Sequence, residues 1–285
     1  LLNISGSLRS GSTGINSLPR TDGESPAECG KPSRLWEGPL SLNPTLKVLS
    51  SMRQHGVRSL LMGGQACVFY GAAEFSRDVD FVLIADENNL NRLDQAMRAL
   101  QAEVVAVPPF EQKFLEVGLA VHFRCQLEAV KGFRVDVMSR MRGVDPFPDL
   151  WKRRTTIEVD GDIVDLLSLP DLVKAKKTQR SKDWPMIQRL VESNWFQNHR
   201  EPNPARMNFW LKECRTPELL RKIAHEYPEQ ATLISESRPL LRIALEKESG
   251  DLEQALDEER KEEMAKDKAY WEPLLKEIER LRMRR

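Results

Sequence analysis

The sequence predicts an α+β fold, in which a mixed sheet with flanking helices is followed by a mostly helical C-terminal region. Between residues 44 and 166, short apolar runs typical of strands alternate with helical patterns. From Leu167 onward, apolar residues recur at helical spacing, and proline stands at the start of most segments. The pair Asp160-Gly161 lies between two apolar runs, as in a two-residue hairpin turn.

The chain of 285 residues is long enough to bury a core and to form two folded parts. Residues 1–40 are rich in Ser, Gly, Pro and Asn, and we expect a disordered tail there. Residues 41–166 are predicted to hold the sheet, and residues 167–285 the helical region. Within that region, a highly charged stretch is followed by an apolar stripe, which suggests a helical hairpin over residues 251–285.

The elements of the first part follow in order. Asn43-Pro44 is typical of a helix start, and Gly56 is typical of a helix end. A strand over 60–62 is followed by Gly63-Gly64 and a short helix over 65–71. Further predicted elements are a strand over 79–85, an amphipathic helix over 90–100, strands over 104–107, 119–123 and 133–138, and a hairpin over 155–159 and 163–166.

The helical region has five predicted helices before residue 251. They span residues 170–177, 184–192, 204–212, 217–225 and 239–247. Four tryptophans are expected to anchor the core rather than to stack on bases: Trp184, Trp195, Trp210 and Trp271.

Two aspartates that could carry chemistry are Asp80, in the predicted strand over 79–85, and Asp78, directly before it. Side chains two apart in a strand share a face, so Asp78 and Asp80 project together while Val79 and Phe81 point to the buried side. Two adjacent carboxylates repel each other unless a cation or a shared proton relieves them, and carboxylate oxygens are ligands for magnesium. A third acid, Asp136, lies in another strand-like run and would complete a three-acid metal site.

The double glycine precedes these acids. Gly63-Gly64 follows a predicted strand and opens a helix, which gives a backbone concavity. Glycine allows close approach of a phosphate, and free amides at a helix start attract an anion. The interpretation as an ordinary tight turn stays open.

Together, these motifs resemble a known set. Met62-Gly63-Gly64, the run 78–81 and the run 135–137 resemble the motifs of the DNA polymerase β-like nucleotidyltransferase superfamily. The likeness is nearest to small bacterial nucleotidyltransferases, including the AbiEii-like toxins of toxin–antitoxin systems. Residues 167–183 are similar to the helical segment of that family, and the resemblance covers roughly residues 45–193.

The resemblance implies a nucleotidyltransferase core and a reaction. Such an enzyme binds a nucleoside triphosphate such as ATP with two Mg²⁺ ions, for which Mn²⁺ can substitute. It transfers the nucleoside monophosphate to a hydroxyl of an RNA 3′ end, a protein or a small molecule and releases pyrophosphate. Asp78 and Asp80 would hold both ions, and Asp136 would hold one and could accept the hydroxyl proton. The implied nucleotide-binding residues are Gly63, Gly64, Ser76, Arg77, Lys176 and Asp183.

One departure favours an alternative. Glu74 stands where family members often carry arginine, and it cannot contact a phosphate as arginine does. The alternative is a catalytically weak, nucleotidyltransferase-like binding or regulatory module, in which the C-terminal helices dock a protein partner. A glycosyltransferase is a weaker alternative, because its Asp-x-Asp motif lacks a close upstream glycine pair.

Composition bounds the partners and the location. Lys plus Arg equals Asp plus Glu, 43 each, so no overall field draws the chain to nucleic acid or membrane. The local basic cluster over 174–182 is either a solvated face or a contact for phosphates or an RNA backbone. The four cysteines lie far apart, which argues against structural zinc and suggests a cytoplasmic protein. No run of 18 apolar residues predicts a membrane span.

Overall fold

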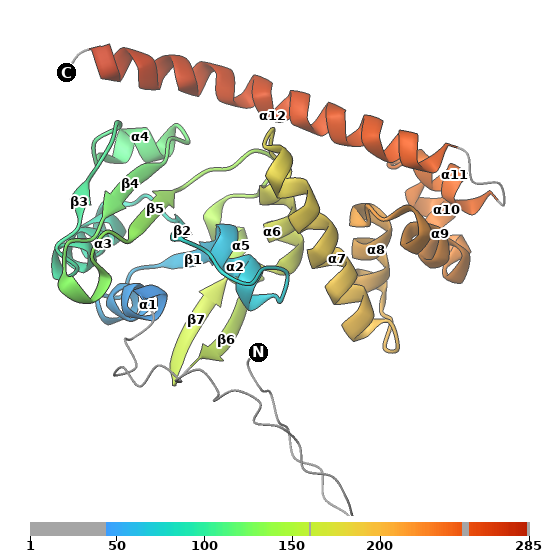
Figure 1. Cartoon of the computed structure of the whole chain (residues 1–285), viewed down its shortest axis with the longest axis horizontal. Helices are drawn as coiled ribbons and strands as arrows, with labels where there is room; N and C mark the ends of the chain where they lie inside the picture. The colour runs from blue at the N-terminus through green and yellow to red at the C-terminus, as the bar shows by residue number, and fades with distance from the viewer. Residues whose placement is uncertain (1–43, 160, 247–250, 284–285) are drawn as a thin grey trace, which may run out of the picture. The chain divides into compact units, whose positions relative to one another are not determined.

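The computed structural model of the chain describes residues 44–159, 161–246 and 251–283. A mixed sheet with helices around it is followed by a helical region, as predicted (Figure 1). The predicted tail over 1–40 lies outside the described residues. These residues belong to one compact unit, so the division expected at residue 166 falls inside that unit and stays a prediction.

The sheet has seven strands in the order β3-β4-β5-β2-β1-β7-β6. The pairs β2–β5 and β1–β7 are parallel, and the other neighbours are antiparallel. The strands are β1 (Ser59–Met62), β2 (Asp78–Leu83), β3 (Glu103–Val104), β4 (Val121–Arg124), β5 (Arg134–Met138), β6 (Thr155–Val159) and β7 (Asp162–Leu166). The expected strand over 104–107 is shorter, since β3 ends at Val104 and only its next N–H, that of Val105, still donates to the carbonyl of His122.

Helices surround the sheet and form the rest of the described chain. Those within the sheet region are α1 (Pro44–Gln54), α2 (Gly63–Phe69), α3 (Glu87–Ala99), α4 (Gln112–Glu116), η1 (Glu128–Val130) and α5 (Phe147–Lys152). Those after it are α6 (Leu169–Lys176), η2 (Ser181–Asp183), α7 (Trp184–Asn198), α8 (Pro204–Glu213), α9 (Pro217–Glu226), α10 (Pro228–Ile234), α11 (Leu240–Leu245) and α12 (Leu252–Met283). The sequence patterns missed the short helices α4, α5 and α10.

The strand register places the acids as expected. In β2, Val79 and Phe81 are buried at 0% and 2% exposure, whereas Asp78 and Asp80 on the other face are partly exposed. Because β5 runs parallel beside β2, the Cα of Asp136 is paired with the Cα of Asp80. Strand alternation in two adjacent strands therefore brings three carboxylates to one face of the sheet.

The C-terminal segment differs from the prediction. Residues Leu252–Met283 form one continuous helix, so the helical hairpin expected over 251–285 is wrong for this segment. No glycine interrupts it, and ion pairs at helical spacing, such as Asp257–Lys261 and Glu272–Lys276, stabilise its exposed sides. The change from charged to apolar residues marks a change of neighbours along one helix, not a turn.

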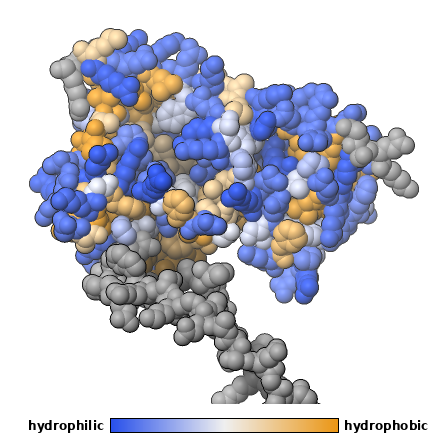
Figure 2. All heavy atoms as spheres, in the orientation of Figure 1, coloured by the Kyte–Doolittle hydropathy of each residue, from blue (hydrophilic) through white to orange (hydrophobic). Residues whose placement is uncertain are grey.

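The surface drawn in Figure 2 is mostly hydrophilic, with apolar side chains in scattered patches. Within the described part of the chain, no helix combines the length and the apolar character that crossing a bilayer needs. The expected core is confirmed at Trp184, Trp195 and Trp210, which are 5%, 2% and 0% exposed.

Candidate functional site

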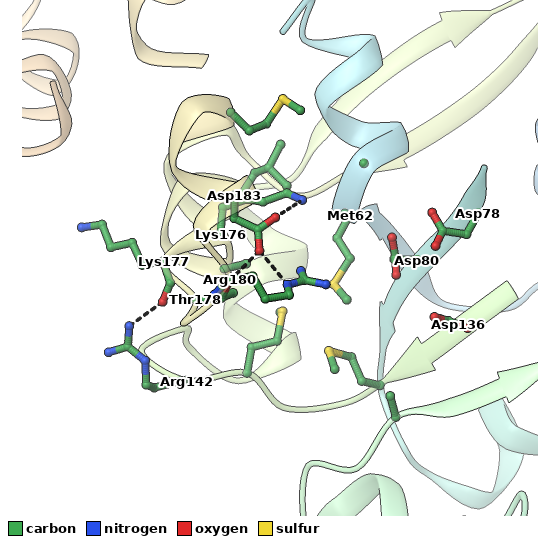
Figure 3. Close-up of a pocket in the computed structure, with 18 of the residues that line it drawn as sticks. Met62, Asp78, Asp80, Asp136, Arg142, Lys176, Lys177, Thr178, Arg180 and Asp183 are labelled. Atoms are coloured by element: carbon green, nitrogen blue, oxygen red, sulfur yellow. Dashed lines mark hydrogen bonds and ion pairs between the residues drawn. The ribbon is translucent and has the colours of Figure 1, made fainter. Parts of the chain in front are cut away.

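A pocket of about 590 Å³ lies where the strand acids face helices α6 and η2 (Figure 3). Its volume is in the range of sites that bind small ligands. Eight of the predicted site residues line it: Gly63, Gly64, Ser76, Asp78, Asp80, Asp136, Lys176 and Asp183. We call the side that carries Asp78, Asp80 and Asp136 the strand wall. We call the side that carries Lys176, Arg180 and Asp183 the helix wall.

Arg77 is the exception among the predicted site residues. It is exposed and does not line the pocket. Arg77 lies just before β2 begins at Asp78. Its contact with the nucleotide stays a prediction.

Asp80 lies at the centre of the strand wall in an unfavourable state for a carboxylate. Burial, together with repulsion from Asp78 and Asp136, raises its pKa to about 6. Gly63 leaves room for this side chain: its φ is +68°, and a Cβ there would overlap the Asp80 carboxylate. The glycine thus serves the placement of an acid as well as a tight turn.

Gly64, Ser76 and Asp78 form the next layer. A Cβ on Gly64 would lie 2.6 Å from Oγ of Ser76, so a larger residue would displace that hydroxyl. Oγ of Ser76 lies 3.0 Å from both the backbone oxygen and Oδ1 of Asp78. Ser76 therefore orients Asp78, a role that differs from the phosphate contact implied by the resemblance.

Asp136 is held by two basic residues. Its Oδ1 accepts a hydrogen bond from Nε of Arg134 at 2.7 Å and lies 2.9 Å from Nδ1 of His122. Burial opposes ionisation of Asp136, but the bonds from His122 and Arg134 outweigh it and lower the pKa of this carboxyl below its ordinary value. Asp136 is therefore ionised, and the guanidinium of Arg134 balances its charge.

This pairing changes the expected metal site. Among the residues that the structure describes, no three His, Cys, Asp or Glu side chains are close enough together to hold a metal ion. The strand register is as predicted, and the side chain of Asp136 is ion-paired with Arg134 while it still adds to the repulsion on Asp80. The three-carboxylate metal site therefore stays a prediction, with its third carboxylate paired to a base in this structure.

The helix wall is a partly buried charge network across the pocket from the acids (Figure 3). Nζ of Lys176 lies 3.3 Å from Oδ1 of Asp183, and both residues are buried. Oδ2 of Asp183 accepts bonds from Thr178 at 2.6 Å and from Nε of Arg180 at 2.8 Å. Burial opposes ionisation of Asp183, but Lys176 and Thr178 outweigh it and lower its pKa.

The sequence patterns missed several residues that line the pocket. Among them are His122, Arg134, Arg142 and Trp271. Arg134 carried a signal, because it lies two residues before Asp136 on one strand and therefore shares its face. Trp271 was expected in the core, yet it is only partly buried and belongs to the distant helix α12. Nothing local in the sequence places α12 at the pocket.

No family model and no curated protein matches the chain. One solved structure that it resembles is that of an antigenic nucleotidyltransferase-like protein from Paracoccidioides brasiliensis. The match covers 71% of this chain and 91% of that one, with 18% identity and a TM-score of 0.37. A likeness at this level says nothing about the activity of this chain.

Proposed function

We propose that the protein is a magnesium-dependent nucleotidyltransferase. The observation that carries the proposal is the strand wall, where desolvation and two further carboxylates raise the pKa of Asp80 to about 6. Such a cluster is costly in a folded protein and is typical of functional sites. The helix wall supports the proposal, since it brings Lys176 and Arg180 to the same pocket, where they can attract phosphates.

The strand wall is suited to a divalent cation. Asp78 and Asp80 offer hard oxygen ligands, and the repulsion that raises the pKa of Asp80 would be relieved by a bound cation. Asp78 and Asp80 would hold magnesium, with Asp136 as a further ligand once it exchanges its partners Arg134 and His122. When bound, magnesium neutralises charge on the transferring phosphoryl group and orients it.

The chain's own residues have separate roles in this proposal. Lys176 and Arg180 attract the triphosphate, and Asp183 fixes both side chains in place. The acceptor hydroxyl oxygen forms a bond to the α-phosphorus, the bond from that phosphorus to the bridging oxygen breaks, and pyrophosphate leaves. The hydroxyl proton passes to solvent water. The lowered pKa of Asp136 makes it a weak proton acceptor, so we assign it an electrostatic role.

The test is transfer of label from nucleotides that are labelled at the α-phosphate. The protein is incubated with each of the four triphosphates and Mg²⁺, with total RNA or alone to detect self-modification. Asp80→Ala should lower transfer by about 10²- to 10³-fold, the usual effect of losing one electrostatic stabiliser. Asp94→Ala, which removes an exposed carboxyl outside the pocket, is the control and should leave transfer unchanged. Equal transfer by wild type and Asp80→Ala would overturn the assignment.

A second candidate is the binding or regulatory module. It is favoured by the ion pair of Asp136 with Arg134, which engages the carboxylate that the two-ion reaction needs. This candidate predicts nucleotide binding that Mg²⁺ does not strengthen, whereas the enzyme predicts tighter binding with Mg²⁺. Calorimetry with ATP in Mg²⁺ or in EDTA separates the two.

A further inference from the structure

Trp271 differs from the tryptophans that fill the core. Trp184, Trp195 and Trp210 are at most 5% exposed, whereas Trp271 is partly exposed and lines the pocket. Of the Phe, Tyr and Trp side chains in the described part of the chain, it alone does so. It is also absent from the apolar residues that pack against the described core. Packing of the core therefore does not explain its position.

The first anchor of this tryptophan lies one turn earlier in α12. Asp267 is 3% exposed, and its Oδ2 accepts a bond of 2.8 Å from the backbone N–H of Gln179, next to the helix wall. Arg142 donates to Oδ1 of Asp267 at 3.3 Å, and also to Glu263 at 2.9 Å and to the carbonyl of Lys177 at 2.7 Å. These contacts hold the middle of α12 against the segment between α6 and η2.

The second contact is made by Tyr270 and Leu274, on either side of Trp271. A Cβ on Gly118 would be 3.9 Å from Cδ1 of Leu274 and 2.9 Å from the hydroxyl of Tyr270, so the ends of both side chains lie close to this glycine. Asp267, Trp271 and Leu274 are spaced i, i+4 and i+7 and therefore share one face of the helix. Trp271 thus lines the pocket between the contacts of Asp267 and Leu274. The ring of Tyr270 meets its ring edge-on, with centroids 5.8 Å apart.

The pocket also has apolar lining residues on the segments that contact α12. Met141 lines the pocket next to Arg142, which is bonded to α12, and Ala120 lies two residues after Gly118, which the ends of Tyr270 and Leu274 approach. A nucleotide has a charged tail and a flat, weakly polar base. The two charged walls, with a cation on the acids, suit the tail, and an indole in a pocket with apolar lining suits the base.

We propose that Trp271 is the stacking platform for the nucleobase, so that helix α12 completes the nucleotide site. This inference rests on the proposed function and adds where the base binds. Stacking uses the π-face that every base has, so the platform fixes the position of the base without selecting among the four.

The test separates base from phosphates with two ligands. Binding of ATP and of inorganic tripolyphosphate, each with Mg²⁺, is measured by calorimetry for the full-length wild type and for Trp271→Leu, Trp271→Phe and Trp271→Ala. Trp271→Leu keeps apolar bulk without a π-face and should weaken ATP binding roughly ten-fold, with tripolyphosphate binding unchanged. Trp271→Phe should retain most of the ATP affinity. Phe196→Ala removes an aromatic side chain that is 64% exposed outside the pocket, and it should change neither affinity.

Each other outcome has a distinct meaning. Equal loss of ATP and tripolyphosphate binding in Trp271→Leu would show that Trp271 only supports the fold of the pocket and would overturn the inference. Unchanged ATP binding in both Trp271→Leu and Trp271→Ala would also overturn it, while leaving the proposed function intact. If the wild type binds neither ligand, the proposed function fails and the inference fails with it.

Discussion

The two walls of the pocket manage charge in opposite ways. In the strand wall, like charges are forced together by the sheet register, and Asp80 keeps a pKa of about 6. In the helix wall, opposite charges neutralise one another, since Asp183 is bonded to Lys176, Thr178 and Arg180. One wall is therefore left in need of a cation, whereas the other is preassembled. The difference suggests that the strand wall carries the chemistry and the helix wall positions the substrate.

The largest change in stability should come from removing the charge of Asp183 in the helix wall. Asp183→Asn removes the counter-charge of buried Lys176 and should lower the free energy of unfolding by about 3–5 kcal/mol, because an uncompensated buried charge remains. Urea unfolding measures it. Lys182→Ala changes an exposed neighbour and should have little effect. A loss of less than about 1 kcal/mol for Asp183→Asn would show that the helix wall does not depend on this pair.

In the strand wall, removing the charge of Asp80 should raise the free energy of unfolding, in contrast to Asp183→Asn. A pKa raised from 3.8 to about 6 means that ionised Asp80 costs the folded state up to about 3 kcal/mol. The folded state holds the proton more tightly, so this cost is complete above the folded pKa of about 6 and is lost as pH falls toward the unfolded value. In EDTA, Asp80→Asn should therefore stabilise the protein at pH well above 6, and by about half as much near pH 5.

The measurement is again urea unfolding, at both pH values. Asp94→Asn replaces a half-exposed carboxyl that is paired with Arg98, so it should change stability by no more than a few tenths of a kcal/mol. Mg²⁺ should stabilise the wild type more than Asp80→Asn, because binding to the folded state alone raises stability. A destabilised Asp80→Asn in EDTA would mean that Asp80 is not under repulsion, and the contrast between the walls would disappear.

The sequence was sufficient for the strand wall because its geometry is local. Period-two alternation places Asp78 and Asp80 on one face, and a second strand with one acid needs only a parallel neighbour to bring Asp136 beside them. What alternation does not give is the partner of each side chain. Arg134 lies on the same strand as Asp136, but the contact with His122 depends on which strand lies on the other side of β5, namely β4.

The pocket's contact with α12 was out of reach of sequence patterns for a different reason. Gln179 and Asp267 are bonded across 88 positions of the chain, and Arg142 and Asp267 across 125. Such pairs leave no periodic trace, and the change of pattern near Trp271 suggested a hairpin although the helix continues. Long-range contacts thus decide what closes the pocket.

Gly63 makes room for Asp80 in two ways. Its backbone has a positive φ, and it has no side chain that would overlap the Asp80 carboxylate. Gly63→Ala should cost roughly 1–2 kcal/mol of stability from the left-handed backbone and should also displace the Asp80 carboxylate, which weakens Mg²⁺ binding. Gly143→Ala is a matched control, because Gly143 has the same φ of +68° but nothing within 4 Å of a Cβ. Similar Mg²⁺ affinity in both variants would show that the space beside Gly63 does not matter to the strand wall.

The smallest effect should come from releasing Asp136. Arg134 is partly exposed, and its ion pair with Asp136 is worth about 1 kcal/mol or less, so Arg134→Gln should tighten Mn²⁺ binding by no more than about five-fold. Titration with Mn²⁺ by calorimetry measures this change. Arg124→Gln makes the same change of net charge on the neighbouring strand β4, at an exposed position outside the pocket, and should have a weaker effect. Weaker Mn²⁺ binding in Arg134→Gln would mean that Arg134 holds Asp136 in place for the metal instead of competing with it, and the strand wall would then be as preassembled as the helix wall.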